Sequence, residues 1–237
     1  MNDHAPDYLE LVRLRVQAMY VSDEHSRMTA INQWDGGHAP RFYLGRTATG
    51  NIWRFRFDVA DELAQEISSL CETEPPLRNP MAAPAHQEHY VRLLAEHAQI
   101  ESVWSGPAFR FPDAAMRPHV SVIAINQDNA ELLCGGLDEW LPDVAHRQPF
   151  VAVIEDGRAV SLCTSARITT AAHEAGVETQ SEYRRRGHAT RAVSAWASAV
   201  GAMGAAPFYS TSWDNLASQG LARTLGLVVI GTNFNIT

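Results

Sequence analysis

The feature that most constrains the fold is the pattern from about residue 150 onward, where a hairpin is followed by alternating strands and helices. Apolar runs predict two strands at 150–154 and 159–168, and the turn Glu155-Asp156-Gly157-Arg158 supplies the positive φ that tight hairpins need. The segments that follow are expected to form a strand at 174–179, a helix at 188–202, a strand at 207–212, a helix at 214–225 and a strand at 227–236. This order indicates a mixed α/β (α+β) architecture.

The N-terminal part of the chain carries a separate set of elements. Apolar residues at helical spacing predict an amphipathic helix over 7–20. The runs RFYLGRT and NIWRFRF, separated by residues 48–51, predict a second hairpin. Asp58 is a candidate cap for a helix over about 60–72, and another helix is expected over about 86–98.

A proline-rich segment at 107–118 is the predicted boundary between two units. These units are an N-terminal α+β region at 1–117 and a C-terminal domain at 118–237. The same segment fits a loop inside one compact unit equally well. Beyond it, the sequence predicts a strand at 120–126 and a helix over 128–142.

Charge and composition exclude some classes of function. The formal net charge of −8 argues against nucleic-acid or anionic-membrane binding, since both need a broad cationic surface. No apolar run approaches the roughly 20 residues that span a bilayer, and the polar start does not resemble a signal peptide, so a cytoplasmic protein is expected. The three cysteines and the scattered histidines show no metal-ligand spacing, so we expect no metal site.

The motif that carries chemistry lies between a predicted strand and a predicted helix. Arg184-Arg185-Arg186-Gly187 is followed directly by His188, where the helix opens. Helix N-termini expose unpaired N–H groups and a partial positive charge, and so bind phosphate. Gly187 lets the backbone come close to a ligand, and the arginines add cationic donors, an arrangement that suits a pyrophosphate. An arginine-rich helix start is explained equally well as a solvated cap.

Arg184, Gly187 and Ala189 form the pattern R-x-x-G-x-A, which resembles the acyl-CoA-binding motif Q/R-x-x-G-x-G/A of the GNAT superfamily of N-acetyltransferases. That family also places an Asn at the head of the next helix, where this chain has Asn215 followed by Ser218. A Leu-Gly-Phe ending is common there, and this chain has Leu-Gly-Leu at 225–227. The resemblance covers about residues 118–237.

The resemblance implies a GNAT fold, with a mostly antiparallel sheet splayed at a cofactor cleft and with acetyl-CoA as cosubstrate. Two strands part there, and the pantetheine arm lies between them by strand-like hydrogen bonding. Carried over by position, the cofactor-binding residues are Val177, Thr179, Arg184, Arg185, Arg186, Gly187, His188, Ala189, Thr190, Asn215 and Ser218. The N-terminal region is expected to cover the acceptor side or to be a degenerate partner domain.

The resemblance also implies direct attack of an amine on the thioester, which needs a base, an oxyanion donor and a proton for the thiolate. Glu174 and Glu178 are candidate bases, with His173 behind them. Strand alternation places both glutamates on one face, unless a bulge disturbs it. Many family members carry a tyrosine seven residues after the Asn. Here that position is Ala222, which leaves Tyr209, Ser212 or water as proton donor, or a reaction that needs no acid.

Two classes of function fit these observations. The first is an N-acetyltransferase acting on a primary amine of a small molecule or peptide, as a monomer or homodimer, with no nucleic-acid or membrane partner. The second is a non-catalytic acyl-CoA-binding sensor or interaction module with the same fold. Binding of the cofactor without acyl transfer across a broad amine panel would favour the second.

Overall fold

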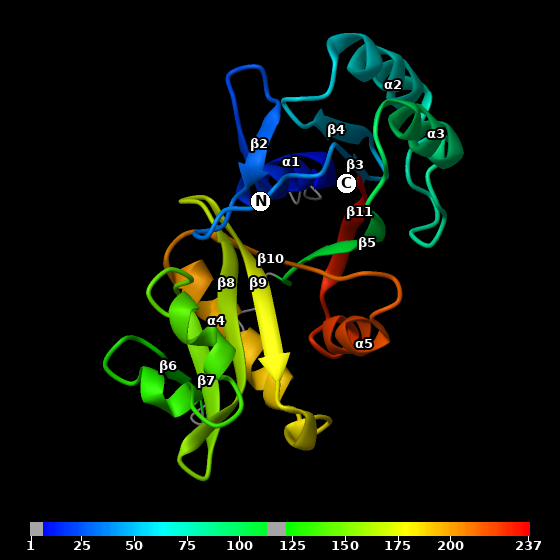
Figure 1. The fold of residues 1–237 in the computed structure, drawn as a ribbon. Coiled ribbons are helices and arrows are strands. Elements are labelled where there is room, and N and C mark those ends of the chain that lie inside the picture. The colour runs from blue at the N-terminus through cyan, green and yellow to red at the C-terminus, as the bar shows by residue number, and fades with distance from the viewer. Residues whose placement is uncertain (1–6, 113–121) are drawn as a thin grey trace.

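The computed structural model describes residues 7–112 and 122–237, and Figure 1 shows how their elements are arranged. Residues 7–112 form α1 (Tyr8–Met19), β1 (Tyr20–Ser22), β2 (Met28–Ile31), β3 (Phe42–Arg46), β4 (Asn51–Phe55), α2 (Asp61–Thr73), α3 (Gln87–His97) and β5 (Val103–Arg110). The three helices expected here are confirmed to within one residue at each end, and β3 and β4 form the expected hairpin. Asp58 does not cap α2; it pairs with Arg56 at 2.7 Å, and the residue before α2 is Ala60.

The second part alternates strands and helices as predicted. It contains β6 (Val122–Ala124), the 3-10 helices η1 (Ala130–Leu133) and η2 (Asp138–Asp143), β7 (Phe150–Glu155), β8 (Arg158–Ile168), β9 (Ala172–Thr179), the 3-10 helix η3 (Ser181–Tyr183), α4 (His188–Ala202), β10 (Ala206–Ser210), α5 (Leu216–Thr224) and β11 (Val228–Ile236). The β7–β8 turn has positive φ at Asp156 (50°) and Gly157 (78°), as the hairpin requires. The strand expected at 120–126 is confirmed over 122–124; it ends before residues 125 and 126, and residues 120 and 121 lie outside the described part of the chain.

The prediction of one helix over 128–142 is wrong. Two short 3-10 helices stand there, separated by Gly135 and Gly136, whose φ angles are +87° and +146°. An α-helix cannot pass through two residues in these conformations. Pro142 also lies within η2, where an α-helix interior would lose a hydrogen bond.

One large sheet spans the molecule. Its strand order is β4-β3-β11-β5-β10-β9-β8-β7-β6, and among these pairs only β9 and β10 run parallel. The mostly antiparallel sheet expected from the sequence is therefore confirmed. β5, which contains Pro107 and was not predicted, lies between β10 and β11. Strands from both sides of residue 117 thus share the sheet. Of the predicted boundary segment 107–118, residues 107–110 belong to β5, and residues 113–118 lie outside the described part of the chain.

Helices cover both faces of this sheet. α4 packs behind β7, β8 and β9 (Figure 1). Its residues Trp196 and Val200 are fully buried. α1 packs on the opposite face, where Val12 and Val16 share a core with Phe208. α2 and α3 pack beside β3 and β11. Within the described residues, no helix is long and apolar enough to cross a membrane.

Candidate functional site

The site begins where β9 and β10 part. Their parallel register ends where Phe208 faces Glu174. β9 continues along β8 as far as Thr179, whereas β10 keeps β5 as its other neighbour. A cavity of about 960 Å³ opens beyond this point, between β9, the start of α4, and α5. Thr179 of β9 and residues of α5 both line this cavity, so the predicted cleft beside Thr179 is present.

The β9 wall of the cleft offers backbone groups to a ligand. Val177 and Thr179 line the cavity, as the sequence predicts. The N–H of Gln180 donates to the carbonyl of Val160 on β8. Because antiparallel pairs alternate, the N–H and C=O groups of Val177 and Thr179 point away from β8 and toward the cleft. This edge can therefore pair with an extended ligand, as in strand addition.

The start of α4 supplies a phosphate-binding helix N-terminus. Gly187 is its N-cap, with φ +78°. The N–H of Arg191 donates to the Gly187 carbonyl, so the amides of His188, Ala189 and Thr190 precede the helical hydrogen bonds. All three residues line the cavity. A Cβ placed on Gly187 would meet no atom within 4 Å, so the turn is open rather than packed against protein.

Two of the three arginines lie at the cleft. Arg184 and Arg185 line the cavity, and the Nε of Arg184 donates to the Thr179 carbonyl at 3.2 Å. Arg186 instead stacks its guanidinium 5.2 Å from the ring centre of Tyr183 and lies 3.9 Å from Glu155. Arg186 therefore adds to the positive potential of the turn without lining the cleft.

The opposite wall of the cleft comes from β10 and α5. Asn215 caps α5: its Oδ1 accepts a hydrogen bond from the N–H of Ser218 at 3.0 Å. The hydroxyls of Ser218 and Tyr209 are 2.6 Å apart, and all three residues line the cavity. Burial raises the pKa of Tyr209 to about 12, against the opposing effect of the Ser218 hydrogen bond. The phenol is protonated at neutral pH and can donate a proton into the cleft.

The candidate bases have different surroundings. Glu178 lines the cavity, and its Oε2 accepts a hydrogen bond from Nε1 of Trp140 at 2.7 Å. Glu174 is buried, with both carboxylate oxygens occupied: Arg15 donates to each of them, and Ser210 donates to Oε1. Glu174 is thus buried and already accepts three hydrogen bonds, whereas Glu178 lines the cavity, so the geometry favours Glu178 as the base.

The side chains of β9 alternate between the two faces of the sheet, as predicted. Glu174 and Glu178 share one face of β9, while Val177 packs toward α4. His173 also faces α4, because its Nδ1 lies 2.8 Å from the Ser165 hydroxyl, which in turn accepts from Trp196. The bulge that the sequence left open falls on β8, between Ser165 and Arg167, and so leaves the alternation of β9 intact.

The histidine of the motif contributes its backbone rather than its ring. The His188 side chain is buried, with Nε2 at 3.3 Å from Glu155 and Nδ1 at 2.5 Å from Arg191. Burial lowers the pKa of His188 below its ordinary value. The ring is therefore neutral near pH 7, and only the amide of His188 is available to an anion.

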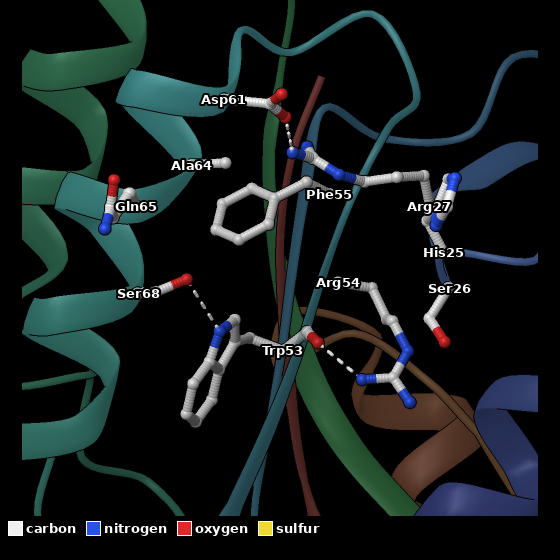
Figure 2. Close-up of a pocket in the computed structure, with 10 residues that line it drawn as sticks. All are labelled: His25, Ser26, Arg27, Trp53, Arg54, Phe55, Asp61, Ala64, Gln65 and Ser68. Atoms are coloured by element: carbon white, nitrogen blue, oxygen red, sulfur yellow. Dashed lines mark hydrogen bonds and ion pairs between the residues drawn. The ribbon is translucent and has the colours of Figure 1, made fainter.

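A second cavity, of about 410 Å³, lies at the other end of the sheet, beside the edge strand β4. In Figure 2, Trp53 points toward Ser68 and Arg27 toward Asp61, at 3.0 Å and 2.5 Å. Four strands separate β4 from β9, so this cavity is not part of the cleft. Of the aromatic residues near this hairpin, Phe42 and Phe55 pack in the core, which is their ordinary role in a hairpin.

Sequence reasoning missed two side chains of the site. Arg15 lies on the apolar face of α1, between Val12 and Val16, and a charge in such a stripe is a signal for a buried partner. Trp140 stands in η2, and nothing in its sequence neighbourhood links it to Glu178, which is 38 residues away.

Comparisons with known proteins find a family model and solved structures that are similar to this chain. The family model described as GNAT acetyltransferase matches residues 150–232. A GCN5-related N-acetyltransferase-like protein from Streptococcus suis has a TM-score of 0.50 at 16% identity, covering 97% of this chain and 100% of that chain. A GNAT-family acetyltransferase from Colwellia psychrerythraea has a TM-score of 0.48 at 9% identity, over 99% and 98% of the two chains. A GNAT-family structure from Novosphingobium aromaticivorans has a TM-score of 0.47 at 19% identity, covering 58% of this chain and 66% of that chain.

A comparison with curated proteins finds no match. At 16% identity, the likeness to the Streptococcus structure shows the fold alone. The family match over 150–232 covers β9, the R-x-x-G-x-A turn, the start of α4, β10 and α5, whose residues line the cleft. Residues 150–232 of this chain thus match the GNAT acetyltransferase family model, and the chain shares the fold of the Streptococcus structure.

Proposed function

We propose that this protein is an acyltransferase that moves an acetyl group from acetyl-CoA to the primary amine of a small molecule or peptide. The observation that carries the proposal is the 960 Å³ cleft, which joins a splayed strand edge to an open helix N-terminus. The diphosphate of coenzyme A matches the unpaired amides of 188–190 and the cations Arg184 and Arg185. The pantetheine arm matches the backbone edge of β9 at Val177 and Thr179, whose N–H and C=O groups point away from β8.

The residues around the cleft supply each requirement of the reaction. Glu178 takes a proton from the attacking amine, whose nitrogen forms a bond to the acetyl carbonyl carbon. The backbone N–H of Val177 is the donor for the oxyanion that develops. When the carbon–sulfur bond breaks, Tyr209 gives its proton to the thiolate. The position where many relatives carry a tyrosine is Ala222, which is fully buried and has no proton to give.

The test combines binding with turnover. Acetyl-CoA at about 100 times its Kd is expected to stabilise the folded protein by about 2.7 kcal/mol, seen as a rise in melting temperature. An amine panel with acetyl-CoA is then expected to give amine-dependent thiol release and an acetylated product by mass spectrometry. Stabilisation without transfer to any amine would instead support the non-catalytic acyl-CoA-binding module. No stabilisation at millimolar acetyl-CoA would contradict both.

A further inference from the structure

Trp140 of η2 lies beside β9, on the same face of the sheet as Glu178. A Cβ added at Gly176, two residues before Glu178 in β9, would be 3.8 Å from Cη2 of the indole. Gly176 and Glu178 share this face because side chains alternate along a strand. The indole therefore lies against β9 at a position where that strand has no side chain.

Neighbouring side chains hold the indole in place. Phe150, which is fully buried, packs edge-to-face with Trp140 at 6.4 Å between ring centres. The guanidinium of Arg147 lies 5.6 Å from the ring centre of Trp140. Arg147 is itself paired with Asp143 at 2.8 Å, and both of these side chains are mostly buried. These contacts give the indole N–H a defined direction in the protein without ligand.

This N–H binds one of the two carboxylate oxygens of Glu178. Nε1 of Trp140 donates to Oε2 at 2.7 Å. Within residues 7–112 and 122–237, no group donates a hydrogen bond to Oε1 of the same carboxylate. Glu178 also lines the cleft, whereas Trp140 does not. One oxygen is thus held from outside the cleft, and the other is available to accept a proton.

We infer that Trp140 is a positioning residue, which orients the carboxylate of Glu178 so that Oε1 receives the proton of the attacking amine. This inference rests on the proposed acetyl transfer with Glu178 as base. A glutamate side chain has several rotatable bonds, so without the indole N–H its carboxylate would occupy more than one rotamer. A displaced base slows proton transfer, because that step depends on hydrogen-bond geometry.

The first test removes the N–H and keeps an aromatic ring. In Trp140→Phe, kcat with acetyl-CoA and an accepted amine is expected to fall about 10-fold, with the KM for acetyl-CoA within about twofold of the wild type. Trp53→Phe removes another indole N–H, which is donated to Ser68 beside β4 (Figure 2), and is the matched control. It should keep the wild-type kcat. A wild-type kcat in Trp140→Phe would overturn the inference.

A double-mutant cycle distinguishes positioning from a purely structural role. If Trp140 acts through Glu178, Trp140→Phe should not lower the residual kcat of Glu178→Gln any further. An equal fall in kcat in the wild-type and Glu178→Gln backgrounds would overturn the inference while acetyl transfer stands.

Crystal structures of the wild type and Trp140→Phe test the orientation itself, even if no amine is acetylated. Glu178 is expected to have one rotamer in the wild type, with Oε1 facing the cleft, and several rotamers in Trp140→Phe. The wild-type rotamer alone in Trp140→Phe would overturn the inference. Failure of the proposed function would be seen separately, as absence of acetyl transfer by the wild type.

Discussion

The guanidinium of Arg15 donates two hydrogen bonds to the carboxylate of Glu174, from Nε to Oε2 at 2.8 Å and from Nη2 to Oε1 at 2.9 Å. Both side chains are buried, and the residues are 159 positions apart in sequence. Glu174 stands at the point where β9 and β10 separate. This pair therefore fixes the N-terminal helix α1 against the base of the cleft.

Removing one partner of this pair is expected to destabilise the folded protein. Arg15→Met or Glu174→Gln should lower the free energy of unfolding by about 3–5 kcal/mol, because each leaves a buried group uncompensated. Urea unfolding measures the loss. Arg92→Met, in an exposed i,i+4 pair with Glu96, should cost less than about 0.5 kcal/mol. A Glu174→Gln variant with normal stability but no acetyl transfer would instead point to Glu174 as the base.

Glu178 is expected to matter for turnover and little for stability. Glu178→Gln keeps the hydrogen-bond acceptor for Trp140 but cannot take a proton, so kcat/KM should fall by about 100-fold or more. Steady-state kinetics with any accepted amine measures this. Glu139→Gln, at an exposed residue beside Trp140, serves as the control. Wild-type rates in Glu178→Gln would remove Glu178 from the mechanism.

Tyr209 is expected to act as the proton donor to the thiolate. Tyr209→Phe removes the hydroxyl that lies 2.6 Å from Ser218, and kcat should fall by about 100-fold. Tyr90→Phe removes another buried hydroxyl, far from the cleft, and should change stability but not kcat. Because the pKa of Tyr209 is about 12, the wild-type rate should show no loss from its ionisation below about pH 10. Unchanged kcat in Tyr209→Phe would leave water as the donor.

Stability is expected to fall in mild acid because of buried histidine. Burial lowers the pKa of His173 in the folded protein, whereas the unfolded chain takes up the proton near about pH 6.5. Below that pH the unfolded state binds more protons, so stability is lost as the pH drops from about 7 to 5. Melting temperatures across this range should fall less steeply in His173→Asn than in the wild type. His25→Asn, at an exposed histidine, should keep the wild-type dependence of melting temperature on pH. The same dependence in His173→Asn as in the wild type would contradict the role assigned to His173.

Local patterns in the sequence predicted the elements that their own residues determine. The limits of α4 follow from Gly187 at its start and from regular apolar spacing, and the β7–β8 turn follows from Asp156-Gly157. β5 could not be predicted in this way, because Gly106 and Pro107 disfavour a strand locally. Gly106 is required by tertiary contact: a Cβ there would lie 1.8 Å from the Thr211 carbonyl oxygen.

In the site, too, local features were predictable from the sequence and contacts between distant residues were not. The open turn at Gly187 and the Asn215 at the head of α5 depend on local sequence and were expected from the motif and the family pattern. The partners that distinguish the two glutamates are not local, since Arg15 and Trp140 reach β9 from distant segments. No spacing rule in the sequence relates such residues, so only the fold separates Glu178 from Glu174.

The central claim is that the open turn at Gly187 binds the diphosphate of coenzyme A. Calorimetric titration of coenzyme A into Gly187→Leu and Gly204→Leu tests it most directly. Both glycines have φ near +80° and open space at the Cβ position, so both variants carry the same backbone strain, about 1–2 kcal/mol. We predict a Kd raised more than about tenfold in Gly187→Leu alone. Equal Kd values for the two variants and the wild type would contradict the account.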